Sequence, residues 1–170
     1  EETKRMKVIL SMLFALLFAF SAAACAPEGE SGSTLVKDWL DGLHSGNAAR
    51  VEMEVSGEKI YAALADNAAA KEFADRLAKG ETTLAFSDFA GAEKIAYPSP
   101  PFTLSDAEGC DPEIGDVTIY KPWGNIAIFY RDSSGYSSDL VYLGKIEGDG
   151  IGIFAAQSGD FTVTLRLAGD

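Results

Sequence analysis

The sequence predicts a mainly β domain of the α+β or barrel type. Many short segments rich in β-branched and aromatic residues are separated by turns that contain glycine or asparagine. Only one long stretch, residues 67–79, has the composition and periodicity of a main helix. Residues 126–130, IAIFY, form a nearly unbroken apolar run, as expected of a strand that is covered on both faces.

Length and charge restrict the possible functions. The chain has 170 residues, 47% of them hydrophobic, which allows one compact domain with a real core plus a targeting segment. The net charge of −12 argues against binding to nucleic acid, which needs stripes of Lys and Arg. Anionic lipid headgroups also repel such a chain, so membrane attachment would require something other than charge.

Residues 1–24 are predicted to be a lipoprotein signal peptide. A basic start is followed by an apolar run and then by the small residues 21–24, which end at Cys25. This arrangement resembles a bacterial lipobox, a signal whose cysteine becomes the mature N-terminus and carries the acyl chains. We therefore expect a chain attached through lipidated Cys25 to the extracytoplasmic side of the cell membrane.

The lipobox is not ideal, because Ala22 stands where leucine is commonest. Ordinary secretion and an uncleaved anchor remain the alternatives. Lipidation of Cys25 would leave Cys110 as a single thiol, unable to form an internal disulfide or a cysteine-rich metal site.

Residues 25–48 are predicted to be a tether. Its first part is rich in Gly, Ser, Pro and Glu, and a short helix is possible over residues 34–42. His44, the only histidine, lies in a polar turn. A metal cluster needs companion ligands and a catalytic triad needs a histidine in the domain, so neither is expected.

The domain, residues 49–170, begins with a predicted hairpin. Residues 50–56 alternate polar and apolar side chains, residues 57–58 turn the chain, and residues 59–64 form the second strand.

The main helix is predicted over residues 67–79, with Asp66 as N-cap and Gly80 as the stop. Its apolar residues recur at i, i+3, i+4 and i+7 from Ala70, and Glu72 and Arg76 form an outward i, i+4 pair.

The remaining chain reads as strands and loops. Residues 82–86 and 140–146 are predicted strands, residues 161–167 a closing strand, and residues 151–156 either a strand or a helical turn. Residues 87–113 are predicted to be a long, mostly irregular loop.

The central hairpin, residues 116–130, turns at Pro122-Trp-Gly-Asn125, where Pro presets φ and both Gly124 and Asn125 tolerate positive φ.

Aromatic residues around this hairpin are the candidate ligand contacts. Trp123 and Tyr136 flank the apolar strand, where such rings can line a cavity. Trp123 is either a groove anchor or a packed turn residue, and Tyr120 and Phe129 are either contacts or core. Arg131, the one well-placed arginine at a strand end, is either catalytic or paired with Asp132 or Asp139.

No metal or cofactor is expected. Asp116, Asp132 and Asp139 carry oxygen ligands, but their spacing matches no calcium loop. The sequence also has no phosphate-binding glycine loop.

Several motifs are together specific, and over roughly residues 50–168 the chain resembles the bacterial cyclophilin-like domain family. They are LADNAAA at 64–70, DFAGAEKI at 88–95, GD at 115–116, PWGNIAIFYR at 122–131, LGKI at 143–146 and AQSGDF at 156–161. The resemblance implies a closed β-barrel, with the helix at one mouth, related in fold to the peptidyl-prolyl isomerases.

The resemblance also exposes departures. The isomerases carry a catalytic Arg just ahead of a mid-chain Phe-x-x-Gln. Here Phe154-Ala-Ala-Gln157 lies near the C-terminus and no Arg closely precedes it. By the order of elements, residues 89–104 correspond to the segment that carries the catalytic Arg in the isomerases, and their only cation is Lys94. Phe129 matches a groove-lining Phe of the isomerases. The predicted ligand groove therefore comprises Trp123, Phe129, Tyr120, Tyr136 and Gln157.

Two functions follow as hypotheses. The first is a membrane-tethered, extracytoplasmic, non-catalytic module whose barrel mouth binds a peptide or small ligand. The alternative is a peptidyl-prolyl cis-trans isomerase with an altered active site, because isomerisation needs a donor aimed at the prolyl nitrogen.

Overall fold

A computed structural model of the chain describes residues 49–102, 104, 107–133 and 135–169. The predicted signal peptide, the lipidated Cys25, the tether and His44 lie outside these residues. Within the described part, no helix has the length and hydrophobicity needed to span a membrane.

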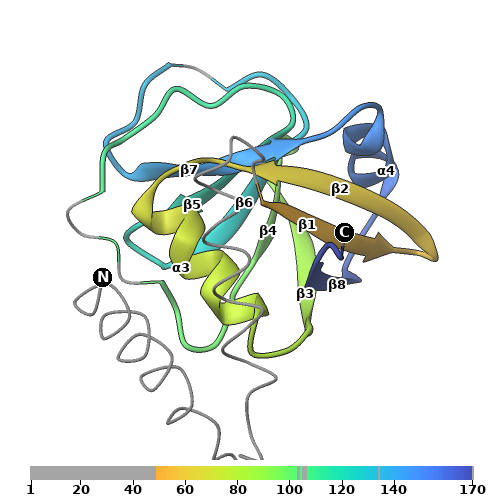
Figure 1. Ribbon diagram of the computed structural model, residues 1–170. Coiled ribbons are helices and arrows are strands. Elements are labelled where there is room, and N and C mark those ends of the chain that lie inside the picture. The colour runs from red at the N-terminus through yellow and green to blue at the C-terminus, as the bar shows by residue number, and fades with distance from the viewer. Residues whose placement is uncertain (1–48, 103, 105–106, 134, 170) are drawn as a thin grey trace, which may run out of the picture. The chain divides into compact units, whose positions relative to one another are not determined.

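Eight antiparallel strands form a closed barrel, as predicted (Figure 1). Around the barrel they follow the order β1-β2-β7-β5-β6-β4-β3-β8, and β8 pairs with β1 to close it. The strands are β1 (Arg50–Val55), β2 (Glu58–Leu64), β3 (Thr82–Phe89), β4 (Glu93–Ala96), β5 (Asp116–Tyr120), β6 (Asn125–Phe129), β7 (Leu140–Ile146) and β8 (Phe161–Leu167).

Strand β6 is buried along its whole length, which confirms the prediction from its apolar run. Ile126 and Ile128 belong to the main core inside the barrel. Ala127 and Phe129 point the other way and form a smaller outer cluster with Ile95 and Leu140. The alternation of side chains along a strand thus gives this barrel wall two apolar faces.

Helix α3 (Ala68–Leu77) forms at the predicted place and packs against β7 and β8. Its N-cap is Asn67, not Asp66 as predicted. The Asn67 amide accepts from the Ala70 N–H at 2.8 Å and donates to the Tyr142 carbonyl at 2.9 Å. An aspartate would offer no donor for the second bond. The predicted Glu72–Arg76 pair forms at 2.6 Å.

The segment predicted as a long irregular loop contains strand β4, which is a correction. Strand β3 extends to Phe89, and a tight turn with positive φ at Ala90 and Gly91 leads into β4. The Asp88 carboxylate accepts the Gly91 N–H at 2.9 Å in this turn. Alternation could not reveal β4, because Lys94 occupies an interior position normally taken by an apolar residue.

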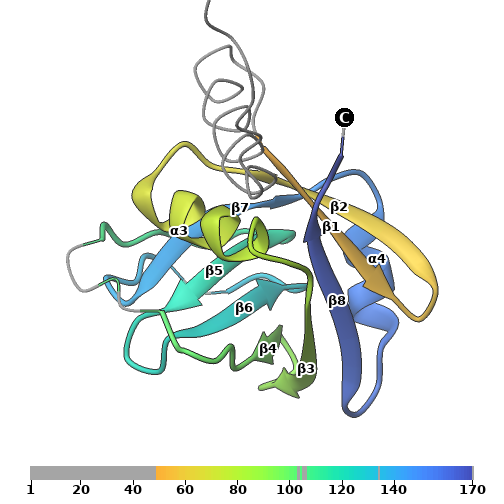
Figure 2. The ribbon, with the colours of Figure 1, turned by 60° about the horizontal axis from the view of Figure 1, so that its bottom comes forward.

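Residues 151–156, left open between strand and helix, belong to helix α4 (Gly150–Ala156). Helices α3 and α4 lie on opposite sides of the barrel (Figure 2).

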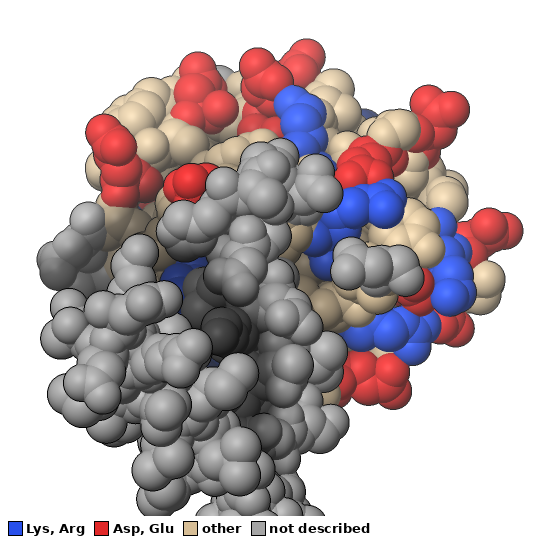
Figure 3. All heavy atoms as spheres, viewed as in Figure 1, with Lys and Arg blue, Asp and Glu red and all other residues tan. Residues whose placement is uncertain are grey.

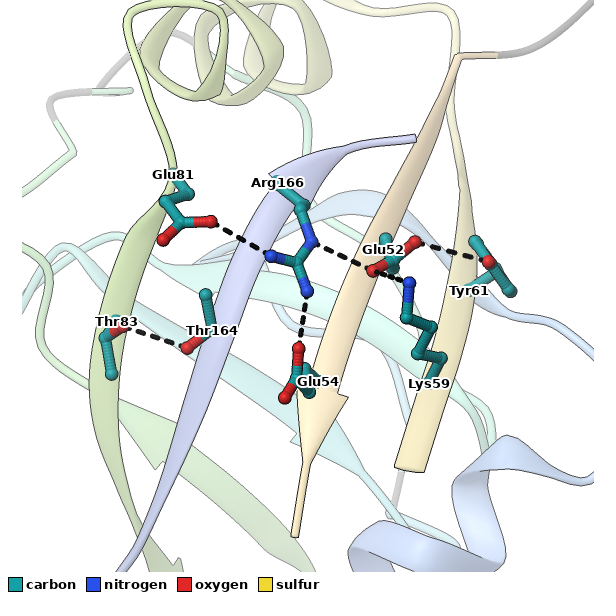
Figure 4. A network of polar contacts seen from close by, with 8 residues as sticks. All are labelled: Glu52, Glu54, Lys59, Tyr61, Glu81, Thr83, Thr164 and Arg166. Carbon is teal, nitrogen blue, oxygen red and sulfur yellow. Dashed lines mark hydrogen bonds and ion pairs between the residues drawn. The ribbon is translucent and has the colours of Figure 1, made fainter. Parts of the chain in front are cut away.

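A charge network holds the outer face of β1, β2 and β8 together (Figure 4). Arg166 pairs with Glu52 at 2.9 Å, with Glu54 at 2.5 Å and with Glu81 at 2.9 Å. Lys59 also reaches Glu52, at 3.0 Å. The bonded carboxylates raise the pKa of the Arg166 guanidinium. One cation therefore joins acidic side chains that would otherwise repel one another across neighbouring strands.

Candidate functional site

An aromatic hollow of about 240 Å³ lies on the outer wall of the barrel. Three rings line it, from Phe89 on β3, Tyr120 on β5 and Trp123 in the β5–β6 turn. Ile95 and Leu140 add apolar surface, and Glu93, Asn125 and Ser137 add polar groups. The volume is below the usual range for drug-sized ligands, so the hollow suits one side chain or a small molecule.

Strand register explains why these residues meet. Phe89 is directly opposite Glu93 in the β3–β4 pair, and Tyr120 is directly opposite Asn125 in the β5–β6 pair. Opposite residues of an antiparallel pair share a face of the sheet. Ile95 lies two residues beyond Glu93 and therefore shares that face too.

The rings form an angular wall around Trp123. Its ring lies 5.2 Å from Tyr120 and 6.1 Å from Phe89, with interplanar angles of 85° and 88°. Trp123 nevertheless stays 50% exposed. An aromatic side chain held in place yet open to solvent is characteristic of an interaction site.

The turn that presents Trp123 depends on Gly124, as predicted. Gly124 has a φ of +62°, and a Cβ at this position would lie 2.7 Å from the Phe102 carbonyl oxygen. Asn125, by contrast, does not use its tolerance of positive φ, because it is the first residue of β6.

Two acceptors on residues of the hollow, one partly accessible and one buried, have no donor from the described residues. The half-buried Glu93 carboxylate forms neither a hydrogen bond nor an ion pair there, and burial raises the pKa of the Glu93 carboxyl. Asn125 is 2% exposed, and its Oδ1 atom has no hydrogen-bond partner. Neither Lys nor Arg is among the described residues that line the hollow.

The residues predicted to form a groove are only partly brought together. Trp123 and Tyr120 line the hollow, and Phe129 is buried beside it in the outer cluster with Ile95 and Leu140. Tyr136 is 65% exposed and does not line the hollow. Gln157 follows α4, where its side chain bonds Ser56 and the Ile153 carbonyl.

Arg131 also lies outside the lining of the hollow. Its guanidinium is 5.6 Å from the centre of the Tyr130 ring, and it forms no ion pair with Asp132 or Asp139 within the described part. Sequence reasoning missed Phe89, Glu93 and Asn125. The motif DFAGAEKI contains the first two, but a hairpin there had to be recognised before they could be placed together.

Lys94, the only cation in residues 89–104, points into the barrel and is 2% exposed. Its ammonium donates to Asp88 Oδ2 and to the Gln157 carbonyl, both at 2.8 Å, and lies 4.7 Å from the centre of the Tyr130 ring. Tyr130 donates to the same Asp88 oxygen at 2.5 Å. Hydrogen bonds from Lys94 and Tyr130 lower the pKa of the Asp88 carboxyl to about 2. This cluster is satisfied internally and faces away from the hollow.

The low Asp88 pKa predicts an acid-dependent loss of stability. A depressed carboxyl pKa stabilises the fold above the unfolded-state value of about 3.9. This contribution should disappear as the pH falls from about 4 to about 2. Urea unfolding across this range should show a shallower pH dependence for Asp88→Asn than for the parent. Asp160→Asn, an exposed control, should retain the parental slope, and parallel curves for Asp88→Asn would contradict the assignment.

A second cavity, of about 320 Å³, lies beside α3. Arg76 lines it, but its guanidinium is bonded to Glu72 and to the carbonyls of Pro100 and Pro101. None of the predicted groove residues lines this cavity. Two of those residues, Trp123 and Tyr120, line the hollow on the outer wall instead.

Other candidate chemistry is not assembled in the described part of the chain. Burial raises the pKa of the Cys110 thiol to about 11, which keeps it protonated and unreactive at neutral pH. The described residues bring no three His, Cys, Asp or Glu side chains together as a metal ion would require.

Fold and site together define a closed antiparallel barrel with a small aromatic site on its outer wall. A model of the Cyclophilin-like family matches residues 53–166, and the chain belongs to this family. The solution structure of a hypothetical protein from Archaeoglobus fulgidus is similar, with a TM-score of 0.56 and 15% identity, over 72% of this chain and 96% of that chain. This likeness concerns the fold alone. No curated protein matches the chain.

Proposed function

We propose that this chain is a lipid-tethered binding module on the extracytoplasmic side of a bacterial membrane. In this proposal the aromatic hollow receives a peptide side chain or a small ligand without catalysing a reaction on it. The observation that carries the proposal is Trp123, half exposed yet fixed between Tyr120 and Phe89.

The absence of catalysis is inferred from the donors. Prolyl isomerisation crosses a barrier of about 18–20 kcal/mol, and a catalyst needs a donor aimed at the prolyl nitrogen. Three cations could supply such a donor. Arg131 and Arg76 do not line the hollow, and Lys94 points into the barrel. The tether through Cys25 rests on the sequence pattern of residues 1–25.

Trp123→Ala should weaken ligand binding by about 2 kcal/mol, roughly thirtyfold, as expected of a central aromatic anchor. Tetrapeptides of the form Ala-Xaa-Pro-Phe, with Xaa varied, and small organic probes can be titrated and followed by calorimetry. Tryptophan fluorescence in a Trp39→Phe background isolates the signal of Trp123, since the chain has two tryptophans. Tyr136→Ala is a matched control that removes an exposed ring outside the hollow.

A proline-limited refolding assay separates binding from catalysis. We expect no acceleration by the purified protein. Acceleration that is lost in Trp123→Ala would replace the binding proposal with an isomerase. If no peptide or organic probe changes the Trp123 signal, the hollow is not a binding site.

A further inference from the structure

We infer that the hollow selects organic cations, an alkylammonium group being the chemistry that its walls and acceptors fit. This inference rests on the proposed binding function and names its ligand class. Aromatic faces attract cations through the ring quadrupole, and aromatic cages are used to bind quaternary ammonium groups.

The ring geometry provides such walls. Phe89 and Tyr120 each stand nearly perpendicular to Trp123, so the three rings do not stack into a closed layer. A group in the hollow therefore meets aromatic surface from more than one direction. The volume of about 240 Å³ admits a compact ammonium group or one extended side chain.

The polar groups favour the same charge. The Glu93 carboxylate lines the hollow and has no donor among the described residues. Asn125 Oδ1 also lacks a partner there, but this atom is buried from solvent. Glu93 stands directly opposite Phe89 across β3 and β4, which places the carboxylate beside an aromatic wall. A bound cation would supply the counter-charge that the described residues do not provide. An anionic ligand would meet the carboxylate without any Lys or Arg lining the hollow to offset it.

The surrounding field acts in the same direction. The chain carries a net charge of −12, and Figure 3 shows acidic side chains spread over the described surface of the face it draws, with Lys and Arg among them. Such a field raises the local concentration of cations and speeds their association. A cation is thus favoured by the aromatic walls, by the Glu93 carboxylate and by the net charge of the chain.

Choline and its neutral isostere 3,3-dimethylbutan-1-ol test this inference, because they share shape and differ in charge. In the Trp39→Phe background we expect choline to change the Trp123 fluorescence saturably and to bind at least tenfold more tightly than the isostere. Nα-acetyl-lysine methyl ester compared with the norleucine analogue asks whether a peptide side chain or a small molecule is preferred. Preference in either pair supports an alkylammonium site.

Glu93→Gln should weaken choline binding at least tenfold and leave isostere binding unchanged. Glu58→Gln removes the same charge from an exposed position on β2 and should change choline affinity less than twofold. Circular dichroism checks that both variants fold. Equal binding of the charged and neutral probes, or equal effects of the two variants, would overturn the inference while leaving the binding function intact. If no probe changes the Trp123 fluorescence, both the cation preference and the proposed binding function are overturned.

Discussion

Lys94→Met should destabilise the protein by about 3 kcal/mol, the lower end of the cost of breaking a buried ion pair. The substitution keeps the length of the side chain and removes its charge. Asp88 would lose the cation 2.8 Å away, and the Gln157 carbonyl would lose its donor. Because Asp88 is partly exposed, water would compensate for some of this loss, which places the expected value at the lower end.

A double-mutant cycle with Asp88→Asn isolates the interaction. The two partners touch, so their effects should not add, and the double variant should lose less than the sum of the single ones. The free energies of unfolding are measured in urea at neutral pH. A Lys94→Met variant within about 0.5 kcal/mol of the parent, the range of an ordinary surface substitution, would show that the cluster contributes little. Binding at the hollow should survive in the folded variant, since Lys94 and Glu93 point to opposite faces of β4.

Phe154→Ala should cost about 3–5 kcal/mol, the range for removing a buried phenylalanine. Phe154 is fully buried in the core. Its ring lies 6.1 Å from Phe86 and 6.2 Å from Phe161 in edge-to-face contacts. The Phe-x-x-Gln likeness to the isomerases is therefore a core contact followed by the end of α4, not part of the hollow.

Comparing variants of Phe154 and Gln157 tests whether this segment is a core contact or part of a groove. Phe154→Leu should lose less stability than Phe154→Ala, because most of the buried volume is kept. Gln157→Ala, in a half-buried position, should change little. Both should leave the response of Trp123 to ligands unchanged when measured on folded protein. Loss of ligand binding in Gln157→Ala, without loss of stability, would reinstate the segment as part of a groove.

The family shapes how these experiments are interpreted. Membership of the Cyclophilin-like family covers the barrel but leaves the chemistry of its outer wall to the individual chain. In this chain the outer wall carries three aromatic rings and the Glu93 carboxylate, whereas the Lys94 side chain points into the barrel and bonds Asp88. The hollow and the Lys94 cluster thus occupy opposite faces of the same short strand.

Local patterns in the sequence determined most of the barrel. Three patterns each reflect the burial of one element: the apolar run of β6, the alternation in β1 and β8, and the helical spacing around Phe73. Such patterns predict an element without knowledge of the elements that pack against it. The sequence could place Trp123 near Tyr120, because Trp123 lies in the turn that follows the strand ending at Tyr120.

Only the tertiary structure decided how the site is completed. Strand β4 was hidden because its interior position holds a lysine whose charge is neutralised by Asp88, a contact that no periodicity reveals. Without β4, Glu93 had no reason to face Phe89, and the hollow had no carboxylate. The Phe-x-x-Gln likeness suggested Gln157 as a groove residue, whereas the structure makes it the C-cap of α4, with its side chain bonded to Ser56 and to the Ile153 carbonyl. The sequence therefore determined which segments are buried, while strand register determined which exposed side chains meet.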